Sequence, residues 1–161
     1  MMLVIDLDDI NCDLLDLLQR DARMSYRELG ERIGLSPPAV AERIRKLEDA
    51  GVITGYEATI DYAAIGYDLL CIIRLNSTGL GRELDELIAE CPEVIEANRV
   101  TGSESHVIRA RVTSTAHLED LFHRFWEFGT TSVTNIVTSS PVPRRPLNVR
   151  AALARAAEVE A

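Results

Sequence analysis

Three basic side chains fall within one short stretch that could contact nucleic acid. The segment GLSPPAVAERIRKLEDAG, residues 34–51, contains Arg43, Arg45 and Lys46 behind two adjacent prolines. Guanidinium and ammonium groups bind phosphate oxygens and base edges, and the N-terminus of a helix attracts anions through its unpaired N–H groups. If this stretch is a helix, its polar side is a candidate surface for DNA.

The spacing of apolar residues in the same stretch predicts a helix with one buried side. Val40, Ile44 and Leu47 fall at positions i, i+4 and i+7, which form a single stripe. Ser36 can cap this helix, the two prolines suit its first turn, and Gly51 can end it in a left-handed conformation. The predicted DNA-contacting residues, on the opposite side and its flanks, are Ser36, Pro38, Ala39, Glu42, Arg43, Arg45 and Lys46.

Two helices should precede this one and a strand should follow it. Helical spacing predicts a helix over 10–18, capped by an aspartate just before it, and a second helix over 26–33. Ser25 and Glu28 have the spacing of a capping box, in which each side chain binds the other residue's backbone N–H. The segment 52–61 alternates in the manner of a strand and predicts a small β-wing. Three helices and a wing are typical of a winged helix-turn-helix.

These residues resemble a known family. The stretch LSPPAVAERIRKLEDAGVITGYEATIDYAAIG closely resembles the recognition helix, wing and hinge of the Lrp/AsnC transcriptional regulators, also called feast/famine regulatory proteins. The upstream stretch LDDINCDLLDLLQRDARMSYRELGERIG extends the match. The resemblance implies sequence-specific binding to double-stranded DNA. It places a winged helix-turn-helix domain at 1–53 and a wing strand and hinge at 54–66.

The second half of the chain predicts a different fold, so that the whole chain is α+β. Strand and helix patterns alternate in the order βαββαβ, which is typical of a ferredoxin-like sandwich with helices on one face of an antiparallel sheet. The other face, substantially apolar, invites a second copy of the chain. This domain should span 67–143, and a tail over 144–161 contains an Ala-rich stretch that favours a helix. The predicted elements are strands at 67–76, 93–100, 106–113 and 132–140 and helices at 81–91 and 115–128.

The family resemblance implies that this half is an ACT-like, or RAM, domain that forms dimers and, in larger assemblies, octamers. It also implies a small effector, typically an amino acid, held between subunits near a turn with the pattern TGxxD. Here Ser105 stands at the aspartate position, which removes a carboxylate that would meet an α-ammonium group. Glu104 is adjacent, but neighbouring side chains on a strand face opposite ways. The predicted effector-binding residues are Thr101, Gly102, Ser103, Glu104, Ser105, His106, Thr134 and Thr138.

Composition and charge limit the other possibilities. The formal net charge is -9, which argues against coating nucleic acid through bulk attraction but does not exclude a local site. No apolar run is long enough to span a bilayer and no signal peptide is recognisable, so we expect a cytoplasmic protein without a membrane partner. Three separated cysteines offer neither a disulfide framework nor a metal knuckle. We expect no metal, no cofactor and no enzymatic activity.

Two alternative functions stay open at this point. The first is a tetrapyrrole-acting enzyme that resembles sirohaem decarboxylase, which shares the two-domain plan. His106, His117 and His123 could then supply acid-base chemistry, although His117 and His123 lie about 240° apart around one helix and cannot share a ligand. The second is a metabolite-binding assembly module that does not bind DNA.

Overall fold

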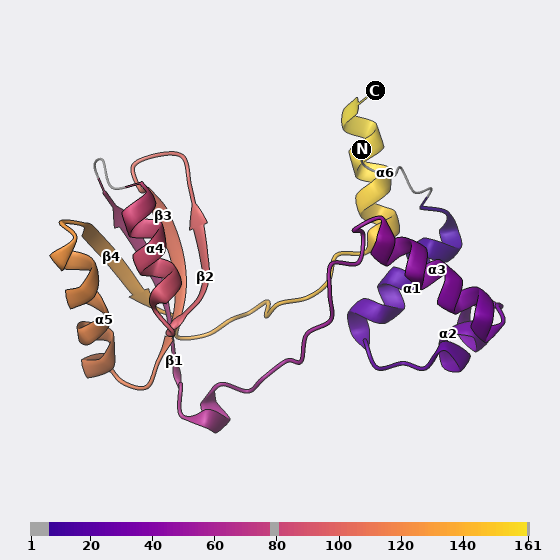
Figure 1. Cartoon of the computed structure of the whole chain (residues 1–161), viewed down its shortest axis with the longest axis horizontal. Coiled ribbons are helices and arrows are strands. Elements are labelled where there is room, and N and C mark those ends of the chain that lie inside the picture. Colours follow the sequence, from indigo (N-terminus) through magenta and orange to yellow (C-terminus); the bar gives the residue numbers. More distant parts are fainter. Residues whose placement is uncertain (1–6, 78–80, 161) are drawn as a thin grey trace. The chain divides into compact units, whose positions relative to one another are not determined.

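The chain folds into two units, each with its own hydrophobic core (Figure 1). The computed structural model describes residues 7–77 and 81–160. The first unit combines the chain up to Ala58 with the chain from Val142 onward, and the second spans Thr59–Pro141. The chain therefore leaves the first unit once and returns to it.

The three predicted N-terminal helices are confirmed, together with two of their caps. The carboxylate of Asp8 accepts the N–H of Asn11 at 2.8 Å at the start of the first helix. The capping box is present, with Ser25 N–H donating to Glu28 at 2.8 Å and Glu28 N–H donating to the Ser25 hydroxyl at 3.2 Å. The helices are α1 (Asp9–Arg20), α2 (Tyr26–Ile33) and α3 (Pro37–Asp49).

The buried stripe of α3 is also confirmed. Val40 and Leu47 are fully buried and Ile44 is 2% exposed. Gly51 follows the helix with φ 71°, in the left-handed region expected of it. Ser36 occupies the N-cap position, but its side chain makes no capping hydrogen bond. The first two helical residues are prolines and have no N–H, so the start of α3 leaves fewer donors for a cap to bind.

A glycine in α2 allows the turn between α2 and α3 to close. Leu35 N–H donates to the carbonyl of Gly30 at 3.0 Å. A Cβ atom on Gly30 would lie 2.3 Å from the carbonyl oxygen of Leu35. A larger side chain at this position would therefore push the turn away from α2, and with it the start of α3.

The predicted wing strand is wrong for this chain. Residues 52–61 contain no strand, and the only regular structure between α3 and the sheet is a short 3-10 helix, η1 (Ala63–Ile65). A strand exists only where its N–H and C=O groups pair with a neighbour, and no described segment pairs with 52–61. Tyr56 instead donates a hydrogen bond to Glu48 at 2.9 Å and ties the segment to α3.

The second unit confirms the ferredoxin-like prediction. Its four antiparallel strands lie in the order β2-β3-β1-β4. Strands β2 and β3 form a hairpin, whereas the connections from β1 to β2 and from β3 to β4 each pass through a helix. The strands are β1 (Leu69–Asn76), β2 (Val94–Arg99), β3 (His106–Val112) and β4 (Thr131–Ile136). The helices are α4 (Arg82–Glu90) and α5 (Thr115–Glu127).

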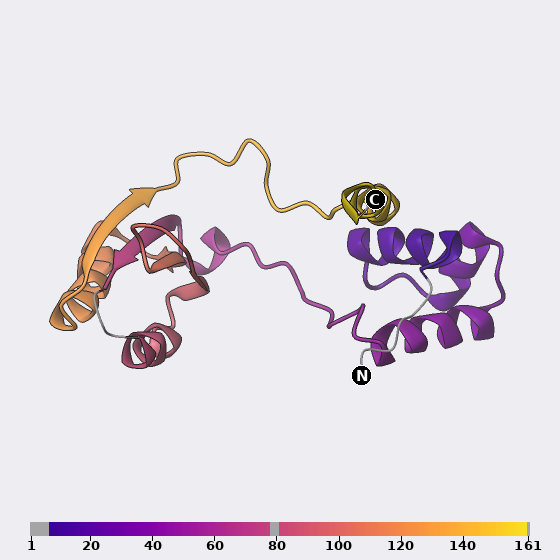
Figure 2. The same ribbon diagram turned by 90° about the horizontal axis from the view of Figure 1, so that it is seen from above.

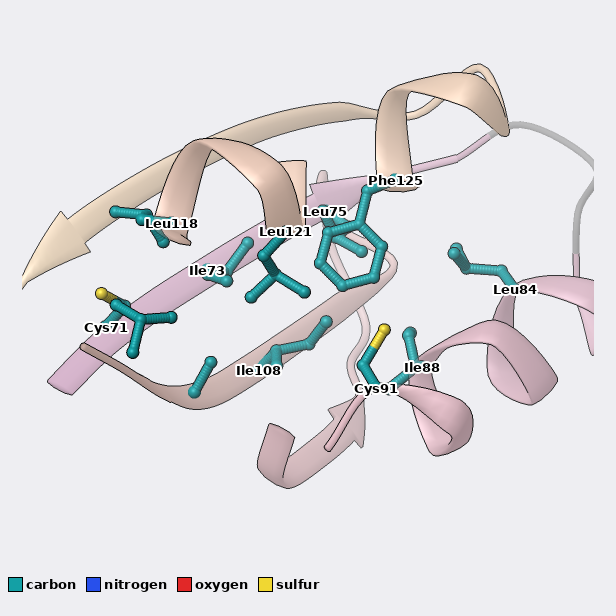
Figure 3. Close-up of a cluster of buried hydrophobic side chains, with 12 residues drawn as sticks. Cys71, Ile73, Leu75, Leu84, Ile88, Cys91, Ile108, Leu118, Leu121 and Phe125 are labelled. Atoms are coloured by element: carbon teal, nitrogen blue, oxygen red, sulfur yellow. The ribbon is translucent and has the colours of Figure 1, made fainter. Parts of the chain in front are cut away.

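Both helices pack on one face of the sheet and build the core there. Alternate residues of β1 and β3 point to this face and are fully buried, as the period of a strand requires. Figure 3 shows how side chains from the sheet meet those from α4 and α5. The residues labelled there are Cys71, Ile73, Leu75, Leu84, Ile88, Cys91, Ile108, Leu118, Leu121 and Phe125.

The uncovered face of the sheet is less apolar than the sequence suggests. Leu70, Ile72 and Val107 are half-buried on it, but three arginines alternate with the apolar residues of β1 and β3. Hydrogen bonds from these arginines to Asn135, Glu96 and the carbonyl of Tyr67 hold the guanidinium groups across the face. The arginines are Arg74, Arg109 and Arg111.

The Ala-rich tail forms a helix, as its composition favours. This helix, α6 (Val149–Glu160), belongs to the first unit and lies beside α1 in both views (Figures 1 and 2). No helix within residues 7–77 and 81–160 is long and apolar enough to cross a membrane.

Candidate functional site

The side of α3 that faces away from the core presents most of the predicted DNA-contacting residues. The side chains of Arg45 and Lys46 each keep 60% of their surface exposed, whereas Ala39 is half-buried. The exposed members of the predicted set are Ser36, Pro38, Glu42, Arg45 and Lys46.

The two exposed cations of α3 are paired with acids on the same helix. Arg45 binds Glu42 at 2.8 Å and Asp49 at 3.2 Å, and Lys46 lies 3.6 Å from Glu42. The hydrogen bond from Arg45 holds the pKa of Glu42 below its usual value. Exposed pairs of this kind contribute little to stability, because water and salt screen them. A phosphate can therefore compete for both cations at little cost.

Arg43 is placed differently from the other predicted residues. Its Nη1 lies 2.8 Å from Oδ2 and 3.0 Å from Oδ1 of Asp8, and it donates to Asn11 at 2.9 Å. The guanidinium is thus directed at the start of α1 and only 30% of the side chain is exposed. Around the helix, Arg43 is about 60° from Val40 on the buried stripe, so its position beside the neighbouring helix could have been inferred.

In the second unit, Ser105 is held by its neighbours at the end of β1. Its N–H donates to the carbonyl of Leu75 at 2.8 Å, and its hydroxyl lies 3.1 Å from the same oxygen. The hydroxyl is also 2.9 Å from Nδ1 of His106 and 3.4 Å from the hydroxyl of Ser77. The single proton of the hydroxyl is therefore directed at acceptors within the chain.

His106 points into the helix-covered side of the sheet and not into the turn. It is 4% exposed, and its Nε2 lies 2.9 Å from Oδ1 of Asp85 on α4. Arg99 forms an ion pair with the same carboxylate. Hydrogen bonds from Arg99 and His106 hold the pKa of Asp85 below its usual value. The alternation of His106 with buried Ile108 indicates from the sequence that His106 faces the core. The sequence does not reveal that Asp85 and Arg99 lie beside it.

Glu104 is the only acid of the predicted effector turn, and it is partly exposed. Its carboxylate accepts a hydrogen bond from Ser103 at 2.7 Å. This bond, together with the nearby charge of Arg74 on the uncovered face, lowers the pKa of Glu104. Thr101 and Gly102 are exposed, and Gly102 has φ 123°.

Within one chain, the two predicted threonines do not join this turn. Thr134 pairs with Ile73 and so faces the helix-covered side, where its buried hydroxyl has no partner among the described residues. Thr138 lies at the opposite end of β1, since Val137 N–H donates to the carbonyl of Leu70 at 2.8 Å. The structure gathers the residues from 101 to 106 but separates them from the last strand's threonines.

A helix-turn-helix unit linked to a ferredoxin-like unit with an exposed turn defines a two-part regulator, and comparison with known proteins agrees. Residues 7–48 match the AsnC-type helix-turn-helix domain, and residues 69–147 match the Lrp/AsnC ligand binding domain. The chain belongs to the Lrp/AsnC family of transcriptional regulators.

Individual relatives extend over most of the chain. It is 35% identical to YezC, an uncharacterised transcriptional regulator of Bacillus subtilis, over 134 residues that make up 83% of this chain and 96% of that protein. The structure of B. subtilis LrpC aligns with a TM-score of 0.81 and 28% identity, covering 87% of this chain and 100% of LrpC. The feast or famine regulatory protein of M. tuberculosis, solved in complex with L-methionine, aligns with a TM-score of 0.82 and 32% identity, covering 88% and 99% of the two chains.

Proposed function

We propose that the protein is a cytoplasmic regulator that binds specific double-stranded DNA with the exposed side of α3 in the major groove. The observation that carries this proposal is the pair of exposed cations, Arg45 and Lys46, on the second helix of a helix-turn-helix. Glu42, released from these cations, can accept a hydrogen bond from a cytosine amino group, and Ala39 can contact a thymine methyl. The N-terminus of α3 near Ser36 suits a backbone phosphate.

Arg43 has a positioning role in this proposal. Its guanidinium is occupied by Asp8 and Asn11, so it fixes the angle between α1 and α3 instead of reading bases. Because only two cations of α3 are exposed, binding to non-specific DNA should be weak and should fall steeply with salt.

A gel-shift against genomic fragments, including the region upstream of the protein's own coding sequence, tests this function. We expect selective retention of a few fragments at low salt. If folded protein retains no fragment selectively, the proposal of sequence-specific binding is wrong.

We also propose that the uncovered face of the sheet pairs with a second copy, as a dimer that can assemble further into an octamer. Ile72 and Leu70 give this face an apolar centre. Around it, the guanidinium groups of Arg74, Arg109 and Arg111 lie across the face, and carboxylates of a facing copy can pair with such groups. A two-fold interface would supply each arginine with acids from the other copy.

The assembly can be measured by analytical ultracentrifugation of the full chain. Ile72→Asp should lower the molecular mass in solution because it places a charge at the centre of the paired faces. Ile65→Asp, on an exposed side chain of η1, is the matched control and should leave the mass unchanged. Equal masses for both variants and the wild type would exclude this face as the interface.

The third part of the proposal is a small effector bound between subunits at the turn from 101 to 106. The methionine complex of the M. tuberculosis relative supports an amino acid or a related molecule. Ser105 supplies no carboxylate, so Glu104, the only acid of this turn, is the group that can meet an ammonium.

A further inference from the structure

The outward side of α1 has a row of acids that take no part in the DNA binding, dimerisation or effector binding proposed above. Asp9, Asp13 and Asp16 are spaced i, i+4 and i+7, so they lie on one side of the helix. Like charges at this spacing repel one another and destabilise a helix in isolation. In the structure all three bind the segment that begins at Leu147, and we name this set the acidic row of α1.

A single arginine of α6 binds two members of the acidic row. Arg150 Nε lies 3.0 Å from Oδ1 of Asp9, and its Nη2 lies 3.0 Å from Oδ1 of Asp13. The same Nη2 is 3.3 Å from the backbone carbonyl of Asp9. The planar guanidinium therefore spans one turn of α1, a geometry that lysine could not reproduce.

The third member of the row binds the beginning of α6. The carboxylate of Asp16 accepts the N–H of Val149 at 3.0 Å and the side-chain amide of Asn148 at 2.9 Å. Asn148 in turn accepts the N–H of Ala151 at 2.8 Å, as an N-cap does. An acid from α1 thus satisfies an orphan donor of α6 and lies at the positive end of its dipole.

The contact continues along the backbone before α6. The side-chain amide of Gln19 donates to the carbonyl of Leu147 at 3.1 Å. Most α6 side chains from 150 to 158 are exposed, so these polar contacts account for much of its attachment. A 12-residue helix is marginal in water without such support. Residues 149–160 also lie beyond the stretches that match the two family domains.

We propose that α6 is a clamp that docks on the acidic row of α1 in the same chain and gives the DNA-binding unit a second connection to the sheet unit. The chain leaves the first unit after Ala58 and returns to it at Val142, so a docked α6 ties that unit through both segments. A DNA-binding unit held by two segments has less freedom to reorient than a unit held by one.

The place of α6 is compatible with DNA binding. In Figure 2, α6 is seen end-on beside α1, on the side of α1 away from α3. The exposed side of α3 with Arg45 and Lys46 therefore stays open. Docking also neutralises part of the acidic charge on α1, which would otherwise repel phosphate.

Hydrogen exchange of the full-length protein tests the docking without any reference to DNA. Arg150→Ala and Asp16→Asn should each raise the exchange rate of the α6 amides by roughly 3- to 10-fold, because a released helix frays. Arg155→Ala is the matched control, because Arg155 pairs within α6 with Glu158. A double variant with Arg150→Asp and Asp13→Arg should recover part of the protection. Equal rates in wild type, Arg150→Ala and Asp16→Asn would overturn the proposal.

Cross-linking decides whether the clamp acts within one chain. Gln19→Cys and Leu147→Cys place thiols on two residues in contact, and a short bis-maleimide can join them, while Cys12, Cys71 and Cys91 are buried. We expect a cross-linked product with the mass of one chain on a denaturing gel, and none from either single variant. A product with the mass of two chains, or no product, would overturn docking within the chain.

Discussion

The carboxylate of Asp8 binds two helices at once. It accepts the N–H of Asn11 at 2.8 Å, which caps α1, and it lies 2.8 Å from Nη1 of Arg43 on α3. The Asn11 N–H and the Arg43 guanidinium together hold the pKa of Asp8 below its usual value. The orientation of α3, the helix proposed to read DNA, is therefore fixed by a contact with the first turn of α1.

Asp8→Ala should destabilise the first unit by about 1–2 kcal/mol, because it removes a cap and leaves Arg43 without its carboxylate. Urea unfolding followed by circular dichroism measures this change. Asp21→Ala is a suitable control, since Asp21 follows α1 and its side chain binds only the nearby N–H of Arg23 among the contacts described. Equal stability of Asp8→Ala and the control would show that the contact does not orient the helices.

Gly30→Ala should cost roughly 1–3 kcal/mol in the first unit, because the new Cβ would lie 2.3 Å from the carbonyl oxygen of Leu35. We expect a lower melting temperature and weaker DNA binding, since the turn that positions α3 must open. Gly81→Ala is the control, because a Cβ there would make only an ordinary contact of 3.6 Å with Arg99. A Gly30→Ala protein with unchanged melting temperature would contradict the close approach.

The second unit should lose stability in acid through Glu93. Burial raises the pKa of Glu93, but hydrogen bonds from His117 and Arg124 outweigh it and hold the pKa below its usual value. Because the pKa of Glu93 is lower in the folded state, its ionised carboxylate stabilises the folded state. This contribution is fully present above the unfolded-state pKa of about 4.3 and is lost as the pH falls through the folded-state pKa.

Glu93→Gln should therefore cost about 1–3 kcal/mol at neutral pH and should flatten the dependence of stability on pH below about 5. Thermal unfolding measured from pH 3 to 7 checks both effects. Glu90→Gln, on an exposed side chain at the end of α4, should behave like the wild type. If the stability of Glu93→Gln falls with pH as steeply as that of the wild type, groups other than Glu93 cause the loss of stability in acid.

The effector turn gives a prediction with two variants. Ser105→Asp should raise the affinity for at least one amino acid, because it restores a carboxylate for the ammonium group, and the wild type should bind all twenty poorly. Glu104→Gln should weaken whatever amino-acid binding the wild type has. Calorimetry on the three proteins tests this. Micromolar binding to the wild type that neither substitution changes would place the pocket elsewhere.

Much of the fold could be predicted from local patterns. The stripe of Val40, Ile44 and Leu47 and the capping box of Ser25 and Glu28 each depend on residues close in sequence, and the structure confirms them. The predicted strand over 52–61 is absent because a strand depends on a distant partner. Alternation shows that a segment can be a strand, but it does not show that another strand is there to pair with it.

The contacts of the candidate sites depend on tertiary neighbours that no spacing reveals. Arg43 stands at the edge of a buried stripe, but only the packing of α1 shows that Asp8 lies there. His106 alternates with core residues, but only the position of α4 shows that Asp85 is its partner. The spacing of Asp9, Asp13 and Asp16 places them on one side of α1, but only the return of the chain at α6 shows what they bind.

The most direct test of the proposed function is a fluorescence-anisotropy titration of a retained DNA fragment, with wild type, Lys46→Ala and Arg82→Ala, at several salt concentrations. Lys46 is exposed on α3, whereas Arg82 pairs with Glu86 on α4 in the other unit, so each variant removes one surface cation. We predict that Lys46→Ala weakens binding roughly 5- to 100-fold, as the loss of a phosphate or base contact would, and that Arg82→Ala matches the wild type. Equal affinity of Lys46→Ala and the wild type at every salt concentration, or an equal loss in both variants, would contradict DNA recognition by the exposed side of α3.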